Sequence, residues 1–189
     1  MNRKNFLALL TIMVCMFFSA QLASANLITN GGFENGMSGW SGSGAIQETS
    51  GFDGYTPHGG DYFAAFGAVG SISPITQTLA TTPGQQYDLS YYFASDGGTP
   101  NQFVTTVGGI VLFNQSNIAA SRGWILYDYM FTATSSLTDL TFSGRNDPAY
   151  LALDDVSVTP STAVPEPTTM LLLGLGLVGL AGARRKFKK

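Results

Sequence analysis

Carboxylates are the first residues of this 189-residue chain that are able to do chemistry. Asp154 lies near the end of an apolar run, where a strand with a period of two places it on the same face as Ala152, Val156 and Val158. Because these valines suit a core, we expect Asp154 to point towards or beside the core. A carboxylate there costs on the order of several kcal/mol unless it is paired or bound to a metal.

A metal cation is the simplest partner for this carboxylate, because residues 26–164 contain only two basic side chains for ion pairs. Glu34 would meet Asp154 if the first and last strands of the fold lie side by side. Carboxylate and carbonyl oxygens are the ligands that Ca²⁺ prefers. Glu34 and Asp154 are therefore predicted to hold a structural Ca²⁺, with Asp61 as a further ligand.

A second interpretation of these carboxylates needs no metal. Asp and Glu side chains commonly accept hydrogen bonds from nearby backbone N–H groups in turns. Glu34 and Asp154 would then cap turns, and the sequence leaves both interpretations open. The neighbouring Asp155 is expected to face solvent.

Aromatic side chains are the second chemically useful group. Tyr92 alternates with Tyr91 and Phe93, so a strand places it on the face opposite to theirs. In a strand, Trp124 likewise lies on the face opposite to that of Tyr127. Tyr92 and Trp124 are predicted to stack against sugar rings, since sugar sites combine aromatic rings with nearby polar groups. The alternative is that both fill a second apolar layer.

Catalytic machinery is not apparent. His58 is the only histidine, it lies among Pro and Gly, and no Ser or Asp near it in the sequence completes a triad. The only cysteine, Cys15, lies in the N-terminal apolar run, so metal ligation by thiolates is excluded from the central region. Paired carboxylates would serve glycoside hydrolysis, but no pair stands out. We predict that the protein is not an enzyme.

The elements that must position these residues are β-strands. Gly-rich and Asn-Gly or Asp-Gly turn signals separate short runs of aromatic and β-branched residues, and no helical periodicity interrupts them. This spacing predicts an all-β fold, an antiparallel β-sandwich over residues 26–160, followed by a linker at 161–164. The predicted strands are 62–66, 73–80, 87–94, 103–107, 110–113, 124–132, 137–143 and 149–158.

The charge of the central region limits its partners. Residues 26–164 hold eleven Asp and Glu against two basic residues, Arg122 and Arg145, and no Lys, so their formal charge is −9, whereas the whole chain carries −3. A surface this acidic is repelled by nucleic acid phosphates and by anionic polymers. It suits cations and neutral ligands.

The N-terminal residues 1–25 have the pattern of a secretory signal peptide. Basic residues at 3 and 4 precede a 13-residue apolar run at 6–18, and Ala23-Ser24-Ala25 is a typical cleavage site. We expect the mature protein to begin at Asn26 and to be exported.

The C-terminal residues 165–189 form a three-part signal. Pro165-Glu166-Pro167 cannot join a preceding helix, and an uncharged apolar run follows, with a predicted transmembrane helix at about 168–183. A basic tail then ends the chain and favours the cytoplasmic side of a membrane. Its charged members are Arg184, Arg185, Lys186, Lys188 and Lys189.

This ending resembles the PEP-CTERM sorting signal of Gram-negative bacteria. The resemblance implies that an exosortase-type membrane enzyme recognises the Pro-Glu-Pro motif and removes the tail from an inner-membrane precursor. It further implies release to the cell surface or extracellular matrix, in the company of exopolysaccharide and biofilm production. A plain C-terminal anchor is the alternative.

The central region resembles galactose-binding-like jelly rolls, including several carbohydrate-binding module families. The resemblance rests on the opening Asn30-Gly-Gly-Phe-Glu34, on Trp40, on the stretch 58–62 and on the closing Leu153-Asp-Asp-Val-Ser-Val158. It implies a jelly-roll sandwich in which Glu34, Asp154 and carbonyls of the Gly-rich stretch hold Ca²⁺. Stretches 82–85, 96–101 and 145–148 also resemble a group of PEP-CTERM proteins.

Two non-catalytic functions follow as expectations. The first is a glycan-binding module that acts on extracellular polysaccharide. The second is a structural matrix protein without a specific ligand.

Overall fold

The computed structural model describes residues 25–121 and 123–161. They form ten strands and one short 3-10 turn, η1 (Phe52–Gly54), and every strand pair is antiparallel. No helix in this part of the chain has the length and apolar character needed to cross a membrane. The strands are β1 (Ser41–Gly42), β2 (Ile46–Thr49), β3 (Tyr62–Phe66), β4 (Ser73–Ala80), β5 (Gln86–Ser95), β6 (Asn101–Val107), β7 (Ile110–Ser116), β8 (Ile125–Thr132), β9 (Leu137–Asn146) and β10 (Leu151–Pro160).

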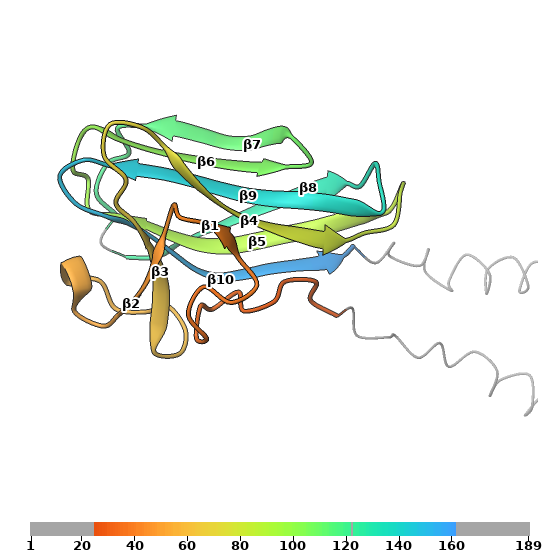
Figure 1. Cartoon of the computed structure of the whole chain (residues 1–189), viewed down its shortest axis with the longest axis horizontal. Coiled ribbons are helices and arrows are strands. Elements are labelled where there is room, and N and C mark those ends of the chain that lie inside the picture. The colour runs from red at the N-terminus through yellow and green to blue at the C-terminus, as the bar shows by residue number, and fades with distance from the viewer. Residues whose placement is uncertain (1–24, 122, 162–189) are drawn as a thin grey trace, which may run out of the picture.

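The strands make two five-stranded sheets with the orders β1-β4-β9-β6-β7 and β2-β3-β10-β5-β8. Figure 1 shows β7, β6, β9 and β4 of the first sheet lying above β5 and β10 of the second. The core lies between them because alternate side chains of β5, β9 and β10 point inwards. The predicted antiparallel sandwich is therefore confirmed. Its largest fully buried side chains include Tyr91, Phe33, Phe66, Phe93, Phe103 and Phe142.

All eight predicted strands are present, and several extend further than the sequence pattern indicates. The hairpin of β6 and β7 turns at Gly108 and Gly109, which both have positive φ, as a tight hairpin turn requires. β1 and β2 were not predicted because they are short and polar. The opening segment is not a strand, but it lies beside β10 as expected: Leu27 N donates to Val158 O at 2.7 Å, and Val156 N to Gly31 O at 3.0 Å.

β10 contains a bulge that corrects the predicted orientation of Asp154. Its pairing with β5 shifts register between Asp154 and Ser157, and Asp155 adopts a φ of 48°. The extra residue reverses the alternation, so Leu153 and Val156 both face the core. Asp154 pairs directly with Tyr92 and points to the outer face of the sheet, not to the face of Val156. The prediction that it shares the face of Val156 and Val158 is wrong.

A second, smaller apolar layer covers this outer face. The loop between β2 and β3 folds over the sheet and places Tyr55 against Phe63 of β3. Ala65, Ala94 and Ala152 contribute small side chains beneath it, and Phe52, Trp124 and Tyr150 pack at its edge. The sheet of β2-β3-β10-β5-β8 is therefore buried on both faces at one end.

Candidate functional site

Asp154 lies beneath the turn that contains His58 and is fully buried. Its Oδ2 accepts the backbone N–H groups of His58 at 2.8 Å and Gly59 at 3.2 Å, and its Oδ1 accepts that of Asp155 at 2.7 Å. Burial raises the pKa of Asp154 to about 6, against the lowering effect of these hydrogen bonds. Asp154 is therefore a buried carboxylate whose desolvation is only partly offset by the three backbone N–H groups.

Glu34 holds the other end of the same turn. Its Oε1 accepts the N–H groups of Asp61 and Tyr62, both at 3.0 Å. Gly60 has a φ of 61°, and a Cβ at this position would lie 2.2 Å from Glu34 Oε1. The turn needs glycine here because only glycine adopts this conformation readily and leaves room for the carboxylate. The turn-capping interpretation of Glu34 and Asp154 is thus present in the structure.

The fit of these residues to a cation is limited. All four carboxylate oxygens of Glu34 and Asp154 accept backbone N–H groups, and Asp61 takes part in these bonds through its own N–H. In residues 25–121 and 123–161, no group of three or more His, Cys, Asp or Glu is arranged to hold a metal. The Ca²⁺ site at Glu34, Asp61 and Asp154 stays a prediction.

The contacts of His58 were not predicted from the sequence. Its ring stacks on that of Tyr92, with centroids 3.5 Å apart and an interplanar angle of 17°. Its Nδ1 lies 2.6 Å from Asp155 Oδ2, so this aspartate orients the ring instead of only facing solvent. Within the described residues no serine or threonine hydroxyl forms a hydrogen bond with the His58 ring, so His58 and Asp155 do not form a catalytic triad. Instead, the His58 ring that Asp155 orients packs against Tyr92.

Trp124 has a different environment from Tyr92. Its Nε1 donates to Thr56 O at 2.9 Å, and its ring packs edgewise against Phe63 and close to Tyr55. The residue therefore pins the covering loop to the sheet. Trp124 therefore packs in a second apolar layer, which was the alternative to a role in sugar binding.

Beyond Tyr92, the outer surface of the sheet is exposed and combines polar with apolar side chains. Leu89 and Tyr91 point into the core, so Ser90 and Asp88 continue the line of Tyr92 along β5. In the paired register of β8, Leu126, Asp128 and Met130 stand beside them. A depression of about 320 Å³ lies here, between Asp88, Asp128 and Met130. We call this surface the β5 face, defined by Asp88, Ser90, Tyr92, Leu126, Asp128 and Met130.

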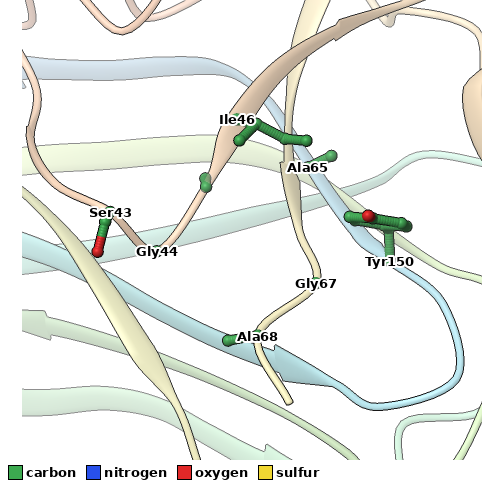
Figure 2. Close-up of a pocket in the computed structure, with 8 residues that line it drawn as sticks. Ser43, Gly44, Ile46, Ala65, Gly67, Ala68 and Tyr150 are labelled. Atoms are coloured by element: carbon green, nitrogen blue, oxygen red, sulfur yellow. The ribbon is translucent and has the colours of Figure 1, made fainter.

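A separate cavity of about 220 Å³ lies at the β2–β3 edge (Figure 2). Its lining is mostly small residues, and the ring of Tyr150 closes one side against Gly67. A Cβ on Gly67 would lie 2.3 Å from the Tyr150 ring, so this close packing requires glycine. The lining contains no Asp, Glu, His, Lys or Arg, and Ser43 and Tyr150 supply its polar side-chain groups.

The targeting residues fall largely outside the described part of the chain. Pro165, Glu166, Pro167, the predicted transmembrane helix, the basic tail and Ala23 lie outside it. Asn26, the predicted first mature residue, is described: its Oδ1 accepts the N–H of Val158 at 2.9 Å and of Ile28 at 3.0 Å. Within the described residues, Asn26 is therefore the first whose side chain bonds to the sandwich. At the other end, Ser161 N still donates to Gln86 O, so sheet bonding reaches the predicted linker.

Solved structures with the same fold include several carbohydrate-binding modules. TmCBM61, solved in complex with β-1,4-galactotriose, is 17% identical with a TM-score of 0.58, covering 73% of this chain and 100% of that one. The CBM22-1 xylan-binding domain of Paenibacillus barcinonensis Xyn10C is 17% identical with a TM-score of 0.53, covering 77% and 100%. The K3 adhesin domain of Lys-gingipain from Porphyromonas gingivalis is 13% identical with a TM-score of 0.54, covering 74% and 100%.

These likenesses assign the body to the jelly-roll fold that carbohydrate-binding modules share. The chain belongs to the family described as "Protein of unknown function (DUF642)", which matches residues 34–159. Residues 163–186 match the PEP-CTERM protein-sorting motif, which confirms the resemblance seen in the sequence. This motif indicates an exported surface protein that is processed at a membrane. No curated protein matches the chain.

Proposed function

We propose that this protein is a non-catalytic glycan-binding module and that the β5 face is its binding surface. The observation that carries the proposal is the placement of Tyr92. Its ring lies on the outer side of a sheet, is only half-buried, and is oriented by the stacked ring of His58. A ring fixed in this way has little conformational entropy to lose on binding, and the face turned away from His58 is the proposed sugar platform.

Polar groups continue from this platform along the strand. Ser90 offers a hydroxyl, and Asp88 and Asp128 offer carboxylates that accept hydrogen bonds from sugar hydroxyls. A fully extended strand rises about 3.3 Å per residue, so the line from Tyr92 to Asp88 spans roughly 13 Å. That length accommodates two to three sugar units of a linear glycan lying parallel to β5.

The charge of the body restricts the glycan. Eleven acidic residues against two basic ones give residues 26–164 a formal charge of −9, with two of the carboxylates on the binding surface itself. Anionic polysaccharides would be repelled. The glycan partner is therefore neutral, or is bound through bridging cations.

The sorting motif supports a place for this activity outside the cell. In the proposal, an exosortase-type enzyme removes the C-terminal tail from an inner-membrane precursor of a Gram-negative bacterium. The body then acts at the cell surface or in the extracellular matrix, where exopolysaccharide of a biofilm is the available glycan.

A structural matrix protein without a specific ligand is the second candidate. The environment of Trp124 favours this second candidate. Trp124 was predicted to bind sugar, but its ring packs against the loop between β2 and β3 and its Nε1 donates to Thr56 O of that loop. In that case Tyr92 would serve the same packing role through His58.

Retardation of the protein in native gels containing the host's extracellular polysaccharide tests the proposal. The wild-type protein should be retarded, and Tyr92→Ala should migrate as it does in a gel without polysaccharide. Tyr62→Ala is the matched control, because Tyr62 is 37% exposed but lies outside the β5 face. Equal migration of the wild type with and without polysaccharide would favour the structural candidate.

A further inference from the structure

Exposed apolar side chains gather at one end of the sandwich. Four of the five most exposed large hydrophobic side chains in the described residues lie here, namely Ile110, Val111, Met130 and Leu137, each at least 55% exposed. Ile110 and Leu137 begin β7 and β9, and Met130 lies near the end of β8. Ile110 and Met130 also line a hollow of about 140 Å³. We call the surface defined by these four residues the apolar end.

The apolar end lies among turns without a charged side chain. The turns at 81–85, 108–109 and 133–136 contain no Asp, Glu, His, Lys or Arg, although the body has a formal charge of −9. The first carboxylates along the strands that leave these turns are Asp88 and Asp139. Exposed apolar patches of this kind mark contacts with a protein or a membrane. The absence of charge here suits a neutral partner.

Both ends of the described chain leave the sandwich at the apolar end. Leu27 N donates to Val158 O at 2.7 Å, and Ser161 N donates to Gln86 O at 2.9 Å, so the chain enters and exits beside the ends of β10 and β5. Figure 1 shows the end of β10 on the right, on the same side as the turns that follow β6 and β8. The link to the sorting motif therefore starts at the apolar end.

This link is short compared with the body. The sorting motif matches residues 163–186, and the transmembrane helix is predicted to start at about residue 168. The seven residues from Ser161 to Thr168 span at most about 25 Å when fully extended. A compact domain of about 140 residues has a radius of gyration of about 14 Å, so it is wider than this link is long. A membrane that holds the tail therefore lies close to the apolar end.

We propose that the apolar end of the precursor rests on the surface of the bilayer that holds its tail. The proposal relies on the membrane-held precursor of the proposed function, but not on glycan binding. The apolar end offers no Lys or Arg for anionic lipids, so the headgroups that it fits are zwitterionic. Its apolar side chains add a second membrane contact to a short apolar span, and two such contacts together give stable anchoring.

This contact would fix the orientation of the glycan surface. Tyr92 lies six residues along β5 from Gln86, which corresponds to about 20 Å in a strand. With the apolar end on the bilayer, Tyr92 is held clear of the headgroups and faces sideways. The precursor would thereby keep the β5 face accessible while its tail is still in the membrane.

Lipid quenching of a site-specific fluorophore tests the contact. Cys15 is the only cysteine, so one introduced cysteine carries one fluorophore in full-length protein with Cys15→Ser. The protein is reconstituted in phosphatidylcholine nanodiscs, with or without a nitroxide on the upper acyl chain. Fluorophores at Ile110→Cys and Leu137→Cys should each lose at least half of their emission to the nitroxide.

The matched control position is Val69, which is 70% exposed and follows β3 at the opposite end of the sandwich. A fluorophore at Val69→Cys should keep its emission. A further fluorophore at Val178→Cys reports separately whether the tail is inserted. Quenching at 178 without quenching at 110 and 137 overturns the contact and leaves the membrane-held precursor intact. The absence of quenching at 178 as well overturns both.

A charge at the apolar end distinguishes contact with the bilayer from mere tethering nearby. In protein labelled at Ile110→Cys, Leu137→Asp should reduce quenching at least twofold, because a carboxylate opposes entry into the bilayer surface. Val69→Asp adds the same charge at the opposite end and should leave quenching unchanged. Both positions are exposed, so neither change disturbs the core. Equal quenching in the two variants, or burial of the label that rises with protein concentration without lipid quenching, overturns the proposal.

Discussion

The buried carboxylate of Asp154 makes an unusual prediction about stability and pH. Burial raises its pKa from 3.8 to about 6 in the folded protein. Between these two values the folded state binds more protons than the unfolded state, so stability falls as pH rises. A rise of about two pKa units corresponds to roughly 3 kcal/mol at pH 8. This sign is opposite to that of an aspartate in a salt bridge.

The perturbation that isolates this effect is Asp154→Asn, which removes the titration but keeps the size of the side chain. Urea unfolding of residues 26–161, monitored by tryptophan fluorescence, gives the free energy of unfolding of both proteins between pH 4 and pH 8. We expect the wild type to lose about 2–3 kcal/mol more than Asp154→Asn over this range. Comparing the two proteins cancels the contribution of the other acidic residues.

Parallel pH curves for the two proteins would refute this reasoning. So would a wild type that gains stability relative to Asp154→Asn as pH rises, because the three N–H donors would then outweigh burial. Asp139→Asn serves as the control for the loss of one negative charge at an exposed position on the other sheet.

Three further predictions concern the tail, the metal and the turn. Intact-mass measurement on protein from its native host should give residues 26 to about 165, and a mature surface protein that retains its apolar tail would contradict removal of the tail. If Ca²⁺ is bound, a hundredfold excess over Kd adds about 2.7 kcal/mol, so chelator should lower the melting temperature by several degrees. Loss of that difference in Glu34→Gln assigns the metal to the predicted site at Glu34 and Asp154, and an unchanged melting curve in chelator leaves turn capping as the role of these carboxylates. Gly60→Ala should destabilise the protein by about 1–3 kcal/mol in urea unfolding, because the residue has positive φ and contacts Glu34; wild-type stability in this variant would show that the turn adapts.

Local patterns explain why most of the fold could be predicted. Alternation of Leu89, Tyr91 and Phe93 with polar residues identifies β5, and the glycine pair at 108 and 109 identifies the β6–β7 hairpin. These signals act over a few residues and need no knowledge of the partner strand. The carboxylates that hold the turn, Glu34 and Asp154, were also identified from sequence.

Features that depend on distant contacts could not be predicted in the same way. The bulge at Asp155 adds one residue to β10 and reverses the facing of Asp154, and no composition signal marks it. The contact of His58 with Asp155 joins residues 97 positions apart, so it appears only once the loop folds over the sheet. The contact of Trp124 with Thr56 of the same loop also joins distant residues, so it could not be predicted from local patterns.

Titration calorimetry of residues 26–161 with the host's extracellular polysaccharide tests the central claim most directly. The wild type should show saturable binding, Tyr62→Ala should bind as tightly as the wild type, and Tyr92→Ala should lose at least tenfold in affinity while keeping its melting temperature within a few degrees. Removing the ring loses its apolar contact area together with about 0.5–1.5 kcal/mol of ring interaction, and a loss of about 1.4 kcal/mol corresponds to a factor of ten in affinity. Binding of equal affinity by the wild type and Tyr92→Ala would contradict the assignment of the β5 face as the glycan site.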